Sequence, residues 1–290
     1  MHPPLVSIVV GSYNRLAFLQ AALDSVRDNG VDFPYEIIVV DGGSTDGTLE
    51  YLIEQKDVIT VIQHNRGEFR GRKIERRSWG YFMNLGFKAA QGKYVLMISD
   101  DSLLIPGAIK NGVDEFENGL SSGRNLGALA FYWRNWPEQN QYWVGITLGG
   151  KMFVNHGLYL RTALEKAGWI DEENYKFYHA DGDLCLKLWH NGYEVAACSR
   201  SFVEHFTHAN LEVRQENLIS QQNDWKTYLN RWTDIYYDPK LDNAGGWLYM
   251  DYHDETNTSR LFPVAKNSWL FGVLRKIKKI FLKIASLYRQ

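Results

Sequence analysis

Residues 36–48 read EIIVVDGGSTDGT, a run in which an apolar stretch changes abruptly into a turn. Its first five residues, Glu36–Val40, are rich in β-branched side chains, which is typical of a strand buried on both faces. The strand is expected to end at Asp41, because glycine and small polar residues fill the positions that follow and favour a turn. Thr48–Glu54 then has the pattern of a short helix.

The same change from apolar strand to polar residues occurs on both sides of this run. Leu5–Val10 predicts one further buried strand, and Tyr94–Ile98 predicts another. Apolar residues at helical spacing separate the strands over the first 120 residues. Alternating strands and helices predict an α/β fold, with a mostly parallel central sheet flanked by helices.

Carboxylates follow two of these strands. Asp41 ends one strand, and Asp100 and Asp101 follow another directly after Ser99. Open α/β sheets bind ligands outside the carboxyl ends of their strands, so we expect the site where these side chains converge. Adjacent carboxylates suit Mg²⁺ or Mn²⁺ held together with substrate phosphates. On spacing alone, the pair fits a turn or a helix cap equally well.

Three stretches, in this order, carry a family resemblance: VSIVVGSYNR at 6–15, EIIVVDGGSTDGT at 36–48 and GKYVLMISDD at 92–101. Together they resemble the family 2 glycosyltransferases, which have the GT-A fold. A fourth stretch, ADGDLCLKL at 180–188, looks like the family's Glu-Asp-x-Asp-Leu helix near the acceptor. The resemblance covers residues 5–210.

The resemblance implies an enzyme that moves a sugar, with inversion, from a nucleotide donor to an acceptor hydroxyl. By position, Tyr13 would stack on the nucleobase, Asp41 would accept its N–H, and Asp100 would contact the ribose. Asp101 would ligate a divalent cation, Mn²⁺ or Mg²⁺, that bridges the donor phosphates. A UDP-sugar is favoured, again by resemblance. The alternatives are a half-buried aromatic at a strand end for Tyr13 and a turn cap for Asp41.

The second half of the chain contributes the candidate general base, Asp181. A carboxylate within reach of the acceptor hydroxyl can take its proton, which is typically worth about 10²–10⁴-fold in rate. Asp183 lies about 200° further round the same helix, so we expect a supporting role, as a cap or an ion-pair partner. The alternative for Asp181 is an acid favoured by the helix dipole.

Histidines and arginines add candidates for the metal and the phosphates. His205 is the candidate metal ligand, because some relatives bind the metal in this region. His208 is the other possibility, and an ordinary polar histidine is the alternative for both. His179 could orient the base. In the basic stretch 66–77, the nucleotide-binding candidate is Arg77, with Arg72 and Arg76 beside it; a solvated loop is the alternative.

Two positions depart from the family's pattern. Ile98 stands where the common Asp-x-Asp-Asp motif has its first Asp, and Ala180 replaces the usual Glu before the base. These departures leave open the alternative that the chain is a non-catalytic GT-A-fold protein, which binds a nucleotide sugar or scaffolds a pathway at the membrane. A nucleotidyltransferase is disfavoured because no basic glycine-rich loop follows the first strand. A dehydrogenase is excluded because no G-x-G-x-x-G does.

The composition of the chain limits the cellular compartments and the classes of partner that we expect. The net charge of −2 hides an asymmetry: residues 266–290 carry seven Lys or Arg and no acid, which leaves 25 basic and 34 acidic residues before them. Because the chain before residue 266 is this acidic, we expect no nucleic-acid partner. Two cysteines suit a reducing compartment, and neither a signal peptide nor an apolar span of about 20 residues is evident. We expect a cytoplasmic protein.

The chain divides into a glycosyltransferase domain at 1–210, a helical and irregular extension at 211–265, and a basic amphipathic helix at 266–290. Apolar residues recur at helical spacing between Leu270 and Tyr288, and Lys and Arg fill much of the opposite face. This pattern predicts that 268–290 binds the anionic surface on the inner face of the membrane. The alternative is that this helix docks on the body of the protein or on a partner. A membrane-bound transferase would suit a lipid-linked glycan acceptor. The aromatic-rich residues 128–160 are expected on the acceptor side.

Overall fold

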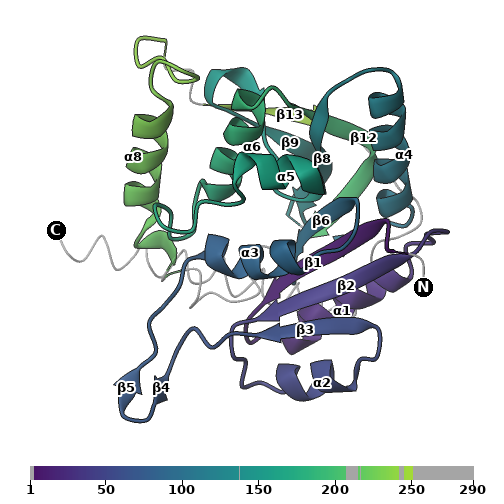
Figure 1. The fold of residues 1–290 in the computed structure, drawn as a ribbon, viewed down its shortest axis with the longest axis vertical. Coiled ribbons are helices and arrows are strands. Elements are labelled where there is room, and N and C mark those ends of the chain that lie inside the picture. Colours follow the sequence, from purple (N-terminus) through teal and green to yellow (C-terminus); the bar gives the residue numbers. More distant parts are fainter. Residues whose placement is uncertain (1–2, 137, 207–214, 216, 242–244, 251–290) are drawn as a thin grey trace. The chain divides into compact units, whose positions relative to one another are not determined.

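Strands β1 (Val6–Ser12), β2 (Tyr35–Asp41) and β6 (Tyr94–Ser99) lie side by side and parallel in the central sheet. The computed structural model describes residues 3–136, 138–206, 215, 217–241 and 245–250, all within one compact unit, Met1–Tyr252. In this part of the chain eleven strands form one sheet, with the order β10-β9-β8-β11-β6-β1-β2-β3 and with β12, β7 and β13 paired at its side (Figure 1).

The other elements of the first half are α1 (Leu16–Arg27), α2 (Thr48–Glu54), β3 (Val58–Ile62), β4 (Glu68–Phe69), β5 (Arg72–Lys73), α3 (Trp79–Ala89), β7 (Ser102–Leu104) and α4 (Ala108–Ser121). The second half contains β8 (Leu126–Asn135), β9 (Tyr142–Thr147), the short 3₁₀ turn η1 (Leu148–Gly150), β10 (Lys151–Met152), β11 (Gly157–Leu160), α5 (Arg161–Ala167), α6 (Ala180–His190), β12 (Glu194–His205), α8 (Gln221–Trp232) and β13 (Gly246–Met250). The predicted alternation of strand and helix is confirmed, and the sheet is mixed beyond β6.

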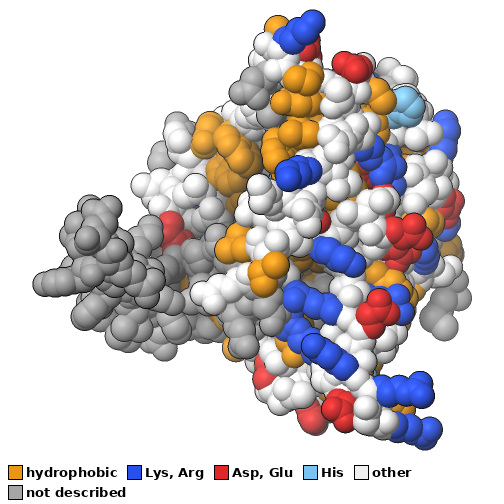
Figure 2. All heavy atoms as spheres, turned by 90° about the vertical axis from the view of Figure 1, so that its left-hand side faces the viewer, with side chains coloured by type: hydrophobic (Ala, Val, Ile, Leu, Met, Phe, Trp, Pro, Cys, Tyr) orange, Lys and Arg blue, Asp and Glu red, His pale blue; other side chains and the backbone are white. Residues whose placement is uncertain are grey.

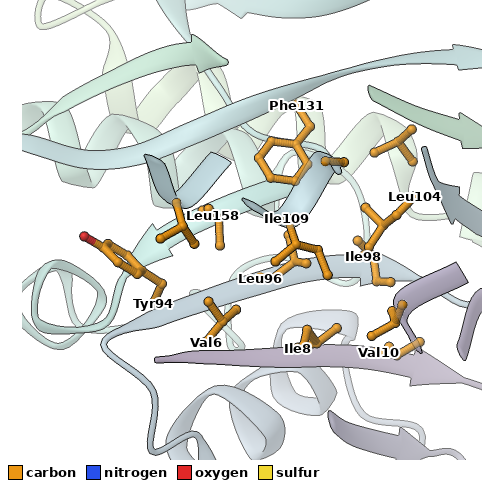
Figure 3. Close-up of a cluster of buried hydrophobic side chains, with 14 of the residues drawn as sticks. Val6, Ile8, Val10, Tyr94, Leu96, Ile98, Leu104, Ile109, Phe131 and Leu158 are labelled. Atoms are coloured by element: carbon orange, nitrogen blue, oxygen red, sulfur yellow. The ribbon is translucent and has the colours of Figure 1, made fainter. Parts of the chain in front are cut away.

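The core follows from the two-residue period of β1. Ile8 and Val10 belong to a buried cluster that also holds Leu19 and Leu23 of α1. Ile8 lies opposite Leu96 and Val10 opposite Ile98 on β6, and Figure 3 shows these side chains in one layer below Phe131 and Leu158. Alternate residues of the strand face α3, where a Cβ on Gly86 would meet Val9 at 2.4 Å and Val40 at 3.1 Å. Because both faces of the strand are covered, the apolar run in the sequence is continuous.

Local contacts set the start of α3. The hydroxyl of Ser78 accepts the backbone N–H of Tyr81 and caps the helix, which begins at Trp79. Within the predicted helical and irregular extension at 211–265, Gly246–Met250 is neither helical nor irregular. That segment is strand β13, which pairs antiparallel with β9 and packs Trp247 against Trp143. Residues 266–290 and His208 lie outside the described residues.

Parallel register brings the strand ends to one edge of the sheet. Ser12 pairs with Asp41, and Gly11 pairs with Ser99, so Asp100 and Asp101 follow directly at that edge. Strand β12 ends beside them, because its last residue, His205, pairs with Ser102 of β7. The topology therefore gathers polar residues from both halves of the chain.

Candidate active site

A cavity of about 740 Å³ lies at this edge of the sheet. Its volume is in the range of small-molecule sites, which is roughly 300–1,000 Å³. Residues from both halves of the chain line it. Among those predicted from the sequence, the cavity is lined by Tyr13, Arg76, Arg77, Asp100, Asp101, His179, Asp181 and His205. Residues that the sequence reasoning missed also line it, among them Arg15, Trp133, Asn155, His156 and Lys176.

Arg15 joins the two carboxylates at the end of β6. Its Nη1 donates to Oδ1 of Asp100 over 2.7 Å and to Oδ2 of Asp101 over 2.9 Å. Burial raises the pKa of Asp100, and the charge of Asp101 raises it further against the opposing effect of Arg15. Burial also disfavours the charge of Asp101, but Arg15 and His205 outweigh it and lower that pKa. One carboxylate, Asp101, is therefore held in its charged form.

The same group fits part of a metal site. Oδ1 of Asp101 is buried and has no hydrogen-bond partner among the residues described, and it lies 3.5 Å from Nε2 of His205. His205 is oriented by Asn135, whose Oδ1 lies 3.3 Å from its Nδ1. No group of three or more His, Cys, Asp or Glu that could hold a metal occurs in the described part of the chain. Two protein ligands suit a cation that takes its remaining ligands from substrate phosphates and water.

Tyr13 forms a flat shelf at the end of β1. A Cβ on Gly42 would lie 3.0 Å from Cδ2 of Tyr13, so the ring rests directly on the backbone of the turn after β2. The guanidinium carbon of Arg66 lies 4.6 Å from the centre of the same ring. An aromatic face at the mouth of a polar cavity is suited to stacking a planar base.

Asp41 is buried behind this shelf and does not itself line the cavity. Its Oδ1 accepts the backbone N–H groups of Gly43 (2.8 Å) and Ser44 (2.7 Å), and its Oδ2 accepts the Ser44 hydroxyl (2.6 Å). It is thus a turn cap, the alternative that the sequence left open. Two carboxylate oxygens have about four acceptor positions, and three of them are used within the turn.

Basic residues surround the opening of the cavity. Arg76 donates to Asn217 over 2.6 Å, and Arg77 lies over the ring of Tyr81 and 3.6 Å from Glu75. Arg72 lies instead on the exposed hairpin β4–β5, which projects from the body (Figure 1). Figure 2 shows Lys and Arg side chains gathered over the lower half of the face that this hairpin belongs to. Of the three candidate arginines, Arg76 and Arg77 therefore line the cavity and Arg72 does not.

Asp181 lies in the first turn of α6 and lines the cavity. Its Oδ2 accepts from Nδ2 of Asn155 over 3.0 Å, and its Oδ1 accepts the backbone N–H of Gly182. Burial raises the pKa of Asp181 to about 6, against the opposing effect of that backbone N–H. A fixed carboxylate with a pKa near neutrality meets the requirements of a general base.

Two residues near Asp181, His179 and Asp183, have other partners. The ring of His179 stacks on Tyr228 at 5.3 Å and lies 4.9 Å from Trp225, whereas Asn155 is the residue that donates a hydrogen bond to Asp181. Asp183 has the predicted supporting role: its Oδ1 accepts from Tyr175 (3.1 Å) and from Nε1 of Trp232 (3.0 Å). Asn155 carried no signal in the sequence, because it lies in the irregular connection between β10 and β11.

Within 128–160, two residues stand out at the cavity. The ring centre of His156 lies 5.2 Å from that of His205 and 5.8 Å from that of Trp133, edge to face with the indole. Burial and the neighbouring His205 lower the pKa of His156 to about 3. It is therefore neutral at neutral pH, and its buried Nδ1 has no hydrogen-bond partner among the described residues. The acceptor-side expectation for 128–160 stays a prediction.

Comparison with known proteins agrees with this architecture. Residues 7–143 match the model of glycosyl transferase family 2. Chondroitin synthase of Escherichia coli is 29% identical over 143 residues, which are 46% of this chain and 20% of that protein. The PGL/p-HBAD biosynthesis glycosyltransferase of Mycobacterium tuberculosis is 38% identical over 109 residues, covering 36% of this chain and 38% of its own. The chain thus spans well under two thirds of these relatives.

Solved structures share the fold at low identity. S. aureus TarS 1–349, in complex with UDP, has a TM-score of 0.51 at 18% identity, covering 78% of this chain and 71% of its own. The mannosyltransferase PcManGT of Pyrobaculum calidifontis, in complex with GDP-Man and Mn²⁺, has a TM-score of 0.52 at 19% identity, covering 71% and 57%. The fold is accordingly GT-A, and residues 7–143 of the chain match the glycosyl transferase family 2 model.

Proposed function

We propose that this protein is an inverting glycosyltransferase that moves a sugar from a nucleotide-sugar donor, favoured to be a UDP-sugar, to an acceptor hydroxyl. One observation carries the proposal. A single cavity holds an aromatic shelf, a charged aspartate beside a histidine, and a fixed carboxylate whose pKa is raised to about 6. These groups match the base, the diphosphate and the acceptor hydroxyl of such a reaction.

The donor would lie along the ends of β1, β2 and β6. Tyr13 would stack on the base, Asp41 would accept a base N–H, and Asp100 would contact the ribose. Arg77 would contact the diphosphate from the cavity's rim. A UDP complex of TarS and a GDP-Man complex of PcManGT leave either base compatible with the fold, and the resemblance of the motifs favours uridine.

Asp101 and His205 would hold a divalent cation, Mn²⁺ or Mg²⁺, which would stabilise the charge that develops on the diphosphate as it leaves. Asp181 would take the proton of the acceptor hydroxyl while that oxygen forms its bond to the anomeric carbon. The bond from that carbon to the diphosphate oxygen breaks on the opposite side, so the configuration inverts. Asn155 would keep the carboxylate aimed at the hydroxyl.

The acceptor and the compartment rest on the sequence alone. We propose a lipid-linked glycan acceptor and a peripheral position at the inner face of the membrane, through the basic amphipathic pattern of 268–290. Among the helices of the described residues, none is long and apolar enough to cross a bilayer.

Thermal unfolding with UDP, GDP, dTDP and CMP, each with Mn²⁺ or with EDTA, tests the proposal. A ligand at 100 times its Kd stabilises by about 2.7 kcal/mol, which raises Tm by roughly 4–5 °C for a chain of this length. We expect a rise with UDP and Mn²⁺ that EDTA abolishes. A rise with another nucleotide alone would replace the donor assignment. No rise with any nucleotide would contradict the transferase proposal and favour the scaffold alternative.

A further inference from the structure

The helix α8 lies outside the family-matched residues and holds a loop of the cavity through one carboxylate. Asp224 is 2% exposed, and it accepts three consecutive backbone N–H groups: Lys176 at Oδ1 (3.1 Å), and Phe177 (3.0 Å) and Tyr178 (2.9 Å) at Oδ2. Hydrogen bonds to a charged carboxylate are stronger than those between neutral groups. The side chains of this loop line the cavity. Through Asp224, helix α8 therefore fixes the conformation of one wall of the cavity.

The loop leads directly into the helix that carries Asp181. The next residue, His179, has φ 65° and ψ 0°, a left-handed conformation that residues other than glycine rarely adopt. Its carbonyl accepts the N–H of Asp183 over 2.8 Å, so it begins the first turn of α6. Such a conformation persists only where its surroundings fix it. Here the rings of Trp225 and Tyr228, both on α8, pack against its imidazole.

Other contacts dock α8 without any help from Asp224. Nε1 of Trp232 donates to Asp183 over 3.0 Å, and the hydroxyls of Tyr228 and Thr147 lie 2.6 Å apart. The guanidinium of Arg231 lies 2.6 Å from Asp171. Removing the carboxylate of Asp224 therefore changes the loop while the helix stays in place.

We propose that Asp224 is a positioning residue for the general base: it fixes residues 176–178 and, together with the rings of Trp225 and Tyr228, the left-handed His179 from which the helix of Asp181 begins. The inference rests on the transferase function proposed above. It means that α8, which lies outside the family-matched residues 7–143, fixes the start of the helix that carries Asp181.

Graded variants at Asp224 test the hold on the loop. In Asp224→Asn one amide end cannot accept, so at least one of the three N–H groups loses its partner; in Asp224→Ala all three do. Asp234→Asn makes the same change at an exposed position just after α8 and serves as the control. We expect hydrogen exchange at residues 176–178 to speed up from wild type to Asn to Ala, with no change in the control. Unchanged exchange in the alanine variant would overturn the proposal.

Turnover separates positioning from binding. The probes are UDP-glucose, UDP-galactose, UDP-GlcNAc and UDP-GalNAc with Mn²⁺, and the readout is release of UDP. We expect kcat of Asp224→Ala to fall by about 10²-fold, because displacements near 1 Å cost that much, while KM for the UDP-sugar and the affinity for UDP stay unchanged. An unchanged kcat, or a loss confined to KM, would overturn the positioning role.

A second pair of variants tests the backbone of His179. His179→Gly and His179→Ala both remove the ring, but only glycine adopts the left-handed conformation without cost. We expect the glycine variant to turn over faster than the alanine variant. An equal or slower rate would overturn the role of this conformation. If the wild-type protein releases no UDP and binds none, the transferase proposal fails, and the exchange experiment still decides whether Asp224 holds the loop.

Discussion

Nη1 of Arg15 donates to Oδ2 of Asp101 over 2.9 Å, so a cation of the chain itself contacts the carboxylate proposed to bind the metal. The same nitrogen also reaches Asp100. Two adjacent buried carboxylates would otherwise repel each other, and Arg15 offsets that repulsion. The sequence shows one Asp fewer than the common motif, and the arginine that balances the remaining pair comes from the turn after β1, where it is the residue before α1.

Arg15→Met should destabilise the protein by about 3–5 kcal/mol, because it leaves two buried carboxylates without their cation. Saturating Mn²⁺ should restore more stability to this variant than it adds to the wild type. Urea unfolding with and without Mn²⁺ measures both effects. Arg27→Met is the control, since Arg27 pairs with the half-exposed Asp57 and should cost about 0–1 kcal/mol. Equal losses for the two variants would contradict the buried-pair account.

Asp101→Asn should abolish the part of UDP binding that depends on Mn²⁺. The amide still gives Arg15 an oxygen to contact, but it is a poor ligand for a hard cation. Calorimetric titration of UDP with Mn²⁺ and with EDTA measures the difference. Asp57→Asn, an exposed change, should leave both titrations as in the wild type. A Mn²⁺ effect that survives in Asp101→Asn would assign the metal to other residues.

Asp181→Asn should keep the affinity for UDP and reduce sugar transfer by about 10²–10⁴-fold, because an amide cannot take the acceptor proton. Release of UDP from a UDP-sugar and calorimetric binding of UDP give the two readouts. Loss of both together would identify Asp181 as a structural residue. Asp234→Asn again supplies the surface control.

Turnover should fall as pH decreases through about 6. Burial raises the pKa of Asp181 to about 6, and a general base acts only in its charged form. Protonation therefore removes the active form below that pH, by about tenfold per unit. A profile of kcat between pH 4.5 and 8 measures the acid limb. A limb near pH 4, the ordinary value for aspartate, would show that the base is solvated during turnover.

Deleting residues 266–290 should release the protein from anionic vesicles. The segment carries seven basic residues and no acid, and each one near such a surface is worth about 1 kcal/mol. Sedimentation with phosphatidylglycerol vesicles, at low and high salt, measures the loss. Phosphatidylcholine vesicles are the control, since they carry no net charge. Unchanged pelleting of the shortened chain would refute the membrane contact.

The parts of this protein that follow local rules could be predicted from its sequence. Apolar runs covered on both faces gave the parallel half of the sheet, and turn residues gave the ends where Asp100 and Asp101 lie. Thr48–Glu54 is a helix at the predicted residues. These features depend on neighbours in the chain, so their signals are local.

Features set by distant contacts escaped prediction. Arg15 looked like an ordinary residue before a helix, yet its role depends on Asp100 and Asp101, which lie 85 and 86 positions further along the chain. Asn155 meets Asp181 only after β10 and β11 have paired into the sheet. Strand β13 exists because β9 offers it an edge. No short window of sequence contains these pairs.

The pairing of β12 determines where this chain can change in length. From Phe202 to His205 the strand keeps continuous register with β8, and from Val203 with β7 as well. Side chains alternate between the faces of a strand, so one residue gained or lost there would turn His205 away from Asp101. The irregularity between Cys198 and Phe202 already carries unpaired residues and can absorb such a change. Insertions can therefore be accommodated before Phe202, whether they arise in evolution or by engineering. They cannot be accommodated within Phe202–His205.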